Sequence, residues 1–314
     1  MSHFNSNMLR YKKLVDNELD TIYINGPTLL REPINHIKFG GKRLRPCLCM
    51  LICDMFNVDI KKALIPAVSI ELLHLFSLVH DDIMDNDDLR HNKITLHKKW
   101  NTSVAILAGD AILALAFRRL NSTDNTIKEL FNGALIAVCE GQALDIEYET
   151  SNIVSKNDYL NMIDFKTGHM IGLSAQLGGI LSKLHIDDIN KLNNYGKLIG
   201  RAFQVQDDLL EISSTSLKMG KTLESDFILG KKTYLMIEAK RLFPKEYDEI
   251  IDISLNDNKK GFQKFKELIK QSGIINDCKD YIHDTFLKAD KMVDTITNNK
   301  NLKEFTQLIK NRKF

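Results

Sequence analysis

The sequence predicts an all-helical protein, and three observations lead to this class. Apolar residues recur with a period near 3.6 over long segments, which is typical of helices with one buried face. Residues that break helices are scarce: the 314 residues include five prolines and 16 glycines, and three of the prolines precede residue 50. No segment shows the alternation of a sheet, and none has low complexity. We therefore expect a single helical domain over residues 1–314.

The helices can be placed in order along the chain. Residues 8–24 form an amphipathic pattern, and Pro27 and Pro33 are expected to bracket the turn that follows. The segment 45–56 is apolar on nearly all sides, which predicts a core helix started by its proline. From about residue 240 the chain is more polar, so its helices should be peripheral. Further helices are predicted at 63–85, 102–119, 126–149, 157–182 and 187–212.

Several glycines lie inside the predicted helices, where each costs roughly 1 kcal/mol relative to alanine. Such positions indicate either close helix packing or room for a ligand, and packing is the simpler interpretation. The glycines are Gly133, Gly141, Gly172, Gly178 and Gly200.

Composition excludes some classes of protein. Lysine plus arginine is 43 and aspartate plus glutamate is 41, a net charge of +2, which gives no reason to expect a nucleic-acid partner. The N-terminus lacks an apolar signal region, and the most apolar long stretch, 104–117, is too short to span a bilayer and contains Asp110. We expect a cytoplasmic protein without a membrane anchor. The odd set of cysteines fits small buried side chains in a reducing compartment: Cys47, Cys49, Cys53, Cys139 and Cys278.

Two short acidic segments carry the strongest functional signal. "HDDIMD" at 80–85 and "QDDLLE" at 206–211 each follow an apolar helical pattern, with first aspartates 207 − 81 = 126 residues apart. Helix positions i and i+4 share a face with i+1 close beside them, so each segment should present three carboxylates to one side. Oxygen-only clusters suit Mg²⁺, and two facing clusters would hold a diphosphate through several ions. These residues are Asp81, Asp82, Asp85, Asp207, Asp208 and Glu211.

The alternative for the first acidic segment is a solvated helix end. That alternative remains our expectation for Asp87 and Asp88, which follow the motif. The second acidic segment makes it a poor explanation for the motif residues themselves.

Three basic segments accompany the acidic ones. "FGGKRLRP" at 39–46 precedes a helix start, where backbone amides and cations favour an anion. "DFKTGHM" at 164–170 puts a lysine in an apolar helix, where it needs an anionic partner. "GKTLESDFILGKKTYL" at 220–235 follows the second acidic helix. The first and third segments could be ordinary solvated loops, and a carboxylate could be the partner of Lys166. Cations around a metal-carboxylate site instead favour a polyphosphate ligand. Their candidates are Lys42, Arg43, Arg45, Lys166, Thr167, Lys221, Lys231 and Lys232.

These segments together resemble the trans-isoprenyl diphosphate synthases, also called polyprenyl synthetases. The matching stretches are "GGKRLRP", "ELLHLFSLVHDDIMDNDDLR", "FKTG", "YGKLIGRAFQVQDDLLEI" and "GKTLESDFILGKKT", in order from about residue 38 to 236. The resemblance implies helices around a deep apolar cavity, usually in a homodimer. It also implies a Mg²⁺-dependent reaction, in which an allylic diphosphate loses pyrophosphate and the cation is attacked head to tail by isopentenyl diphosphate.

The resemblance also assigns roles to individual residues. The acidic residues named above would hold Mg²⁺ on the allylic diphosphate from two sides. The allylic diphosphate and the reacting carbons would be contacted by Arg90, Lys166, Thr167, Gln204, Lys221 and Lys231. Isopentenyl diphosphate would be bound by Lys42, Arg45, His74 and, in part, His91.

Three positions depart from the pattern of the family. His91 stands where a second arginine usually helps to bind isopentenyl diphosphate, so it can serve only as a donor or, when protonated, as a cation. Glu211 replaces an aspartate, and Glu224 replaces a common glycine in the loop that carries Lys221.

Product length should depend on the cavity below the first acidic motif. Phe76 and Ser77 lie five and four residues before Asp81, where the resemblance implies a floor for the growing hydrocarbon. An aromatic at the first position and a small residue at the second favour geranylgeranyl diphosphate, with farnesyl diphosphate as the alternative. A class I terpene cyclase and a regulatory subunit of a heteromeric synthase are less favoured, because both acidic motifs and the basic segment at 39–46 are present.

Overall fold

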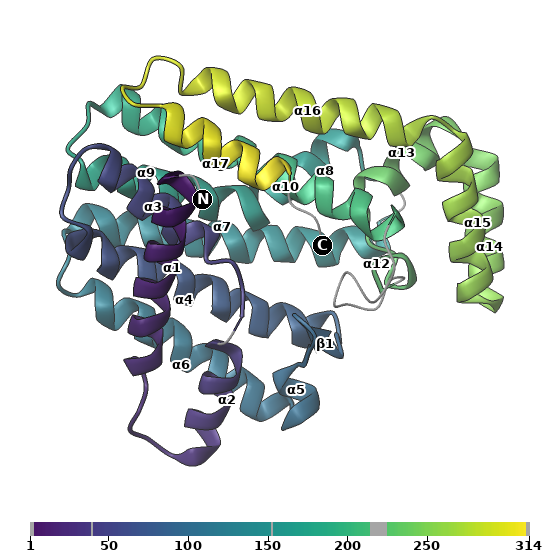
Figure 1. The fold of residues 1–314 in the computed structure, drawn as a ribbon. Coiled ribbons are helices and arrows are strands. Elements are labelled where there is room, and N and C mark those ends of the chain that lie inside the picture. The colour runs from purple at the N-terminus through teal and green to yellow at the C-terminus, as the bar shows by residue number, and fades with distance from the viewer. Residues whose placement is uncertain (1–2, 39, 152, 214–224, 312–314) are drawn as a thin grey trace.

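The computed structural model describes residues 3–38, 40–151, 153–213 and 225–311. Over these residues the protein is almost entirely helical (Figure 1). The strands of the described chain are β1 (Leu89–Arg90) and β2 (Lys93–Ile94), which pair antiparallel as a short hairpin. The all-helical class is confirmed.

The helices agree closely with the sequence pattern. The prediction of 187–212 corresponds to α10, and that of 126–149 to α7. The predicted helix at 157–182 is instead interrupted by the π-helical turn η1, which separates α8 from α9. In chain order the helical elements are α1 (His3–Thr21), α2 (Thr28–Lys38), α3 (Leu44–Met55), α4 (Ile60–Met84), α5 (Leu96–Lys99), α6 (Thr102–Leu120), α7 (Asn125–Thr150), α8 (Lys156–Ile163), η1 (Asp164–Gly168), α9 (His169–Leu181), α10 (Ile186–Ser213), α12 (Ser225–Ile228), α13 (Tyr234–Leu242), α14 (Pro244–Asn256), α15 (Asn258–Gln271), α16 (Ile274–Met292) and α17 (Lys300–Lys310).

Pro33 corrects one expectation. It does not bracket a turn but lies inside α2, where it is buried beside the fully buried Ile34. A proline in a helix removes one backbone hydrogen bond. Burial of its ring and of Ile34 offsets part of that loss, so tertiary packing overrides the local signal.

The long helix α4 runs through the core of the molecule and packs against α3, α6 and α9 (Figure 1). It is long and apolar enough to cross a membrane by length and composition, but 67% of its most apolar 18-residue window is buried inside the fold. Its apolar character therefore has an explanation in core packing. Helix α10 packs against α9 on one side and α16 on another.

The helical glycines mostly mark close helix contacts. A Cβ atom on Gly141, Gly178 or Gly200 would lie within 3 Å of a neighbouring helix, and the same holds for Gly172 against Asn193. Gly133 is the exception, since a Cβ atom there would meet nothing within 4 Å. Packing thus accounts for four of the five positions.

The cysteines are free thiols in the structure. Cys47, Cys49, Cys53 and Cys278 are buried, as expected for small apolar side chains. Cys139 corrects that expectation, because it is exposed on α7.

Helices α14 and α15 form an antiparallel pair at one end of the molecule, away from α4 and α10 (Figure 1). Phe262 and Phe265 of α15 attach this pair to the rest, because their rings pack against Phe227 of α12. The polar C-terminal region begins near the predicted residue 240, although α16 returns along the bundle and packs against α10.

Candidate active site

A pocket with a volume of about 320 Å³ opens between the C-terminal halves of α4 and α10. Helices α7, α8 and α9 and the segment 226–233 complete its wall. Charged side chains line the pocket, and apolar side chains such as Met162, Met170 and Phe203 lie on the same wall. It is lined by Arg45, His74, Ser77, Leu78, Asp81, Asp85, Arg90, His91, Asp145, Tyr159, Met162, Ile163, Lys166, Thr167, Met170, Phe203, Gln204, Asp207, Asp208, Glu211, Asp226, Lys231, Lys232 and Thr233.

The two acidic motifs meet at this pocket. Asp81 and Asp85 reach it from the end of α4, and Asp207 and Glu211 from the last turns of α10. A helix C-terminus carries partial negative charge, so carboxylates there are electrostatically unfavourable unless cations compensate them. Burial and the charge of Asp85 raise the pKa of Asp81, against the opposing effect of Lys166. The arrangement is therefore one that attracts cations.

Asp82 corrects the expectation that three carboxylates share one face. Its carboxylate is buried and contacts Arg90, with Nη2 to Oδ1 at 2.5 Å, and it is not among the described residues that line the pocket. Successive helix residues differ by about 100° in direction, which turns Asp82 toward the β1–β2 hairpin. Burial raises the pKa of Asp82 to about 6, although Arg90 opposes the shift.

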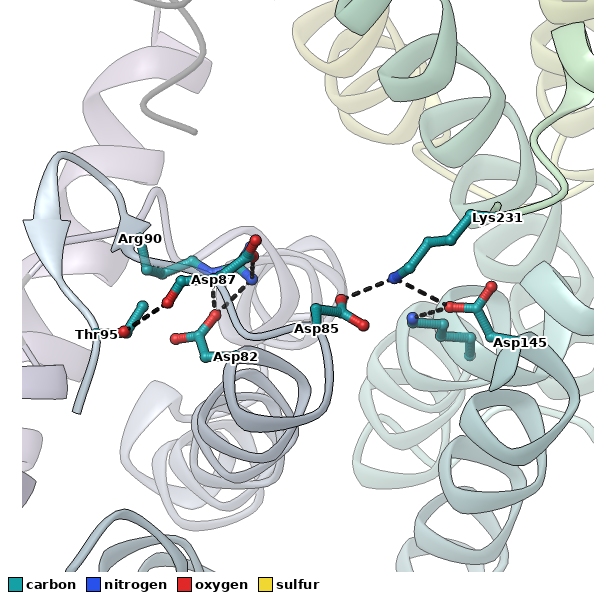
Figure 2. Close-up of polar contacts among 8 residues, drawn as sticks. Asp82, Asp85, Asp87, Arg90, Thr95, Asp145 and Lys231 are labelled. Carbon is teal, nitrogen blue, oxygen red and sulfur yellow. Dashed lines mark hydrogen bonds and ion pairs between the residues drawn. The ribbon is translucent and has the colours of Figure 1, made fainter. Parts of the chain in front are cut away.

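The neighbouring aspartates behave differently from each other. Asp87 is buried and pairs with Arg90 Nη2 at 2.9 Å, so the expectation that it is solvated is wrong. Asp88 is exposed and pairs with Lys98, in agreement with that expectation. Arg90 thus binds two buried carboxylates at once, as Figure 2 shows.

Asp208 occupies the place in the second motif that Asp82 has in the first. It lines the pocket but is buried and accepts hydrogen bonds from Tyr159 Oη at 2.6 Å and from the Tyr234 backbone amide at 3.1 Å. Burial raises its pKa to about 7, an effect that these two hydrogen bonds only partly oppose.

Two lysines and an unpredicted aspartate link the two sides of the pocket. Lys166 Nζ lies 2.7 Å from Asp145 Oδ2. Lys231 Nζ lies 2.8 Å from Asp85 Oδ2 and 3.5 Å from Asp145 Oδ2 (Figure 2). Burial lowers the pKa of Lys166, but the charges of Asp81 and Asp145 outweigh it and raise the pKa. Both lysines are therefore cations that face the acidic motifs.

Asp145 was missed by sequence reasoning, although a signal was present. On α7 it is buried together with Val138, Gly141 and Gln142, which makes a polar pair on an otherwise apolar helix face. A buried carboxylate needs a cationic partner, and that requirement could have drawn attention to it. Asp226 at the start of α12 was also missed, and it lines the same pocket.

Lys166 and Thr167 lie in the π-helical turn η1. The backbone of Lys166 approaches Gly141 so closely that a Cβ atom on Gly141 would lie 2.3 Å from the Lys166 nitrogen. A Cβ atom on Gly200 would lie 2.7 Å from the Gly168 Cα atom. π-Helical turns are rare and frequently occur at functional sites. Thr167 Oγ1 donates to Gln204 Oε1 at 3.1 Å, which places both residues together on the pocket wall as expected.

The remaining predicted cations divide between two sites. Arg45, His74 and His91 line the main pocket near Arg90. Burial lowers the pKa of Arg45 to about 10, and its Nε atom is buried without a hydrogen-bond partner among the described residues. Burial, then the charge of Arg45, holds the pKa of His74 well below its usual value.

Lys42 corrects the expectation that it lies beside Arg45 on the pocket wall. It is exposed and lines a separate surface cavity together with Phe4 and Leu308. Gly40 and Gly41 have positive φ angles and Arg43 is left-handed, so the loop turns sharply and sends Lys42 outward. Its contact with isopentenyl diphosphate stays a prediction.

Arg43, which follows Lys42 in the basic segment, is buried in the fold. Its guanidinium pairs with Asp16 at 2.8 Å and with Glu71 at 2.7 Å. With both carboxylates bound, Arg43 anchors the basic segment rather than offering a free phosphate contact.

His91 lies at the tip of the β1–β2 hairpin. His91 and Asn92 have φ angles of 51° and 60°, the left-handed pair of a two-residue hairpin turn. His91 lines the main pocket, and its pKa is lowered by burial of the ring and by the charge of Arg90, with further cations nearby. It is therefore neutral near pH 7.

The two proposed floor residues are placed differently. Ser77 lines the pocket, and its hydroxyl donates to the His74 carbonyl at 2.9 Å. Phe76 lies behind the wall and packs its ring edge to face on His80 at 4.6 Å. Lys221 and Glu224 lie outside the described residues.

The donor set of the pocket fits Mg²⁺. Asp81, Asp85, Asp207 and Glu211 offer only oxygen atoms, the ligands that Mg²⁺ prefers. Within the described ranges no three carboxylate, histidine or cysteine side chains converge closely enough to form a complete metal site. Waters and phosphate oxygens would have to supply the other ligands of an ion bound there.

Comparisons with known proteins agree with this geometry. The family model for polyprenyl synthetases matches residues 27–295. The short chain isoprenyl diphosphate synthase of Methanocaldococcus jannaschii is 36% identical over 274 residues, or 85% of this chain and 82% of that protein. The geranylgeranyl diphosphate synthase of Saccharolobus solfataricus is 36% identical over 80% of this chain and 79% of that protein.

A solved structure extends the likeness to three dimensions. The geranylgeranyl pyrophosphate synthetase from Pyrococcus horikoshii superimposes with a TM-score of 0.90 at 31% identity, covering 99% of this chain and 100% of that one. The chain belongs to the polyprenyl synthetase family. It is a prenyltransferase that makes short-chain prenyl diphosphates.

Proposed function

We propose that the protein condenses isopentenyl diphosphate head to tail with allylic diphosphates and releases geranylgeranyl diphosphate. The observation that carries this proposal is the pairing of two acidic helix ends with Lys166, Lys231 and Arg90 around one pocket. Such a site matches a diphosphate that must be held by metal ions and by cationic side chains together. Relatives named as geranylgeranyl diphosphate synthases support the product.

Asp81, Asp85, Asp207 and Glu211 would hold Mg²⁺, which supplies charge neutralisation on the leaving diphosphate. Lys166 and Lys231 would donate to its phosphate oxygens, and this contact strengthens as the C–O bond breaks. Three Mg²⁺ ions per active site with substrate bound, and a contact of Lys221 with the allylic diphosphate, are part of the proposal.

The carbocation left by this step needs a dry wall with oriented dipoles. Thr167 and Gln204 face the pocket together and can offer oxygen lone pairs to the reacting carbons. Met162, Met170 and Phe203 keep water away from the cation. The pyrophosphate that leaves is the base placed to accept the final proton.

Isopentenyl diphosphate would bind at the end of the pocket where Arg45, His74, Arg90 and His91 converge. The buried Arg45 guanidinium, with an Nε atom that no described residue satisfies, is the strongest anion donor there. Asp82 and Asp87 orient Arg90 toward this region rather than binding metal themselves.

One assay tests the reaction. The enzyme is supplied with Mg²⁺ and dimethylallyl, geranyl or farnesyl diphosphate, with and without labelled isopentenyl diphosphate, and the products are identified by chain length. We expect label in a 20-carbon diphosphate. Hydrocarbon formed without isopentenyl diphosphate would instead identify a terpene cyclase, and no turnover would identify a regulatory subunit. A 15-carbon product would favour the farnesyl alternative.

Product length has its own test. Ser77 lies on the pocket wall and Phe76 directly behind it, so the cavity should end near this pair. Phe76→Ala should open space toward His80 and give products longer than those of the unchanged enzyme. An unchanged product distribution would show that Phe76 is not the floor.

We further propose that the chain is a single cytoplasmic domain that works as a homodimer. Helices α6 and α7 expose large apolar side chains: Ile106, Leu107, Ile136 and Ile146, each at least 43% exposed. Apolar side chains gathered on neighbouring helices are typical of subunit contacts. Light scattering should give twice the monomer mass, and Leu107→Glu should shift it toward the monomer.

A further inference from the structure

One contact in the pocket joins a proposed substrate-binding cation to a proposed metal ligand. The ammonium of Lys231 bridges Asp85 of α4 and Asp145 of α7 at 2.8 Å and 3.5 Å (Figure 2). The side chains of Lys231, Asp85 and Asp145 are 9%, 11% and 8% exposed. Solvent therefore screens this group of charges only weakly.

Lys231 remains charged in this environment. Burial lowers its pKa, but the negative charges of Asp145, Asp226 and Asp85 outweigh burial and raise the pKa well above its ordinary value. An ammonium at 2.8 Å uses Asp85 Oδ2, the same atom type that a divalent cation would require. A metal ion on Asp85 and the ammonium of Lys231 beside it would repel each other.

Asp145 is a second carboxylate that can bind the ammonium of Lys231. It already accepts from Lys166 at 2.7 Å and lies 3.5 Å from Lys231, so a small rotation of the lysine side chain shortens the second contact. Burial raises the pKa of Asp145, but the charges of Lys166 and Lys231 outweigh it and keep the carboxylate ionised. Asp145 lies on α7, whereas the proposed metal ligands lie at the ends of α4 and α10.

We propose that Lys231 is an internal counterion that competes with divalent metal for Asp85, and that Asp145 holds the ammonium when metal takes its place. The inference rests on the proposed function, because it takes Asp85 as a metal ligand. It adds that metal binding and diphosphate binding are coupled through one side chain. Metal frees the lysine from Asp85, and a bound diphosphate gives the freed ammonium a new partner. The coupling must be reciprocal, so each ligand tightens the other.

Binding of Mn²⁺ to the full-length protein, followed by electron paramagnetic resonance, tests the competition. The probe ligand is inorganic pyrophosphate, present or absent. In Lys231→Met the Mn²⁺ dissociation constant without pyrophosphate should fall about tenfold. The factor by which pyrophosphate tightens Mn²⁺ binding should shrink in the same variant. Lys231→Gln takes its place if the methionine variant does not fold by circular dichroism.

Lys191→Met is the matched control. It removes the same charge from a lysine–aspartate pair of similar length, because the Lys191 ammonium lies 2.9 Å from Asp188 Oδ1, outside the pocket. We expect its Mn²⁺ affinity to change by less than about twofold, the effect of a more distant charge. Equal changes in the two lysine variants, or no change in Lys231→Met, would overturn the competition.

A double-mutant cycle tests the role of Asp145. Asp145→Asn should weaken Mn²⁺ binding, because Lys231 then stays with Asp85. If this effect works through the lysine, it should be largely lost when Asp145→Asn is combined with Lys231→Met. An equal effect of Asp145→Asn in the unchanged protein and in Lys231→Met would exclude Asp145 as the second carboxylate that holds the ammonium of Lys231. Failure of Asp85→Asn to weaken Mn²⁺ binding would instead remove Asp85 as a metal ligand, and with it that part of the proposed function.

Discussion

Asp82 and Asp208 are the second aspartates of two similar motifs, and both are buried, yet the fold satisfies them in different ways. Asp82 is held by the guanidinium of Arg90, which also binds Asp87. Asp208 is held by neutral donors: the Tyr159 hydroxyl, the Tyr234 backbone amide and, at 3.5 Å, the Gln204 carboxamide. Asp82 therefore lies in a group of charges that Arg90 compensates, whereas Asp208 lies in a set of hydrogen bonds from neutral donors.

The difference shows that a repeated motif does not give repeated electrostatics. Burial raises the pKa of Asp82 to about 6 and that of Asp208 to about 7, and only Asp82 has a cation that opposes the shift at close range. Asp82 depends on Arg90 remaining charged in place. Asp208 depends on donors that an uncharged acceptor could also use.

The largest expected effect is on kcat, and it separates Asp81 and Asp207 from Asp82 and Asp208. Asp81→Asn and Asp207→Asn should each lower kcat by about a thousandfold, because each removes a charge that holds metal on the leaving group. Asp208→Asn should lower kcat far less. Steady-state kinetics with geranyl and isopentenyl diphosphates measure both. An equal loss in Asp82→Asn with unchanged stability would mean that Asp82 binds metal after all.

Removal of Arg90 tests the compensated group. Arg90→Met should lower the free energy of unfolding by about 3–5 kcal/mol, since it leaves Asp82 and Asp87 buried without their cation. Urea denaturation followed by circular dichroism measures it. Arg10→Met is the control: the Arg10–Asp54 pair is 53% and 34% exposed, so the loss there should stay below about 1 kcal/mol. Equal losses in both variants would contradict a specific role for burial.

Asp208→Asn tests the hydrogen-bonded group and should have a smaller effect on stability. The carboxamide oxygen can still accept from Tyr159 and Tyr234, so the free energy of unfolding should change by about 1 kcal/mol or less. The same urea titration applies. A loss as large as that of Arg90→Met would show that the negative charge of Asp208 itself stabilises the fold.

The smallest expected effect concerns His91, beside the compensated group. Its pKa lies below the ordinary value of 6.5, because the ring is partly buried and Arg90, Arg43, Lys42 and Lys93 are all positive. The cationic form therefore grows only as pH falls below about 6.5. The KM for isopentenyl diphosphate should fall a few-fold over that range, relative to the profile of His91→Arg, whose charge is constant. Parallel profiles from pH 5.5 to 8, with equal KM at pH 7, would exclude His91 as a substrate contact.

The sequence predicted the helices well because their signals are local. Apolar periodicity located α4, α6, α7 and α10 within a few residues. The prediction that Pro33 brackets a turn was wrong, because burial of the short helix α2 overrides a local helix breaker. The break in the helix predicted at 157–182 had no local signal, since the π turn depends on glycines in other helices.

Only part of the candidate site was predicted, because motif spacing is local and the pairing of side chains from different helices is not. Motif spacing placed Asp81, Asp85 and Asp207 at one pocket, but it could not tell which way Asp82 turns, because that depends on the hairpin carrying Arg90. Lys166 was predicted to need a partner, yet the partner is Asp145, 21 residues earlier in the chain. Such pairings are set by packing between helices, which a single sequence does not display.

The π turn η1 has a consequence for the tolerance of this enzyme to length changes. A π turn holds one residue more than an α-helical turn, so deleting one residue from 164–168 would restore regular helical hydrogen bonding. The wider turn takes up the extra residue, so the same deletion would leave α8 and α9 in nearly the same relative orientation, and Tyr159 would keep its contact with Asp208. The deletion would instead change the turn that carries Lys166 and Thr167, whose backbone passes close to Gly141. It would therefore remove pocket contacts while sparing the helices on either side.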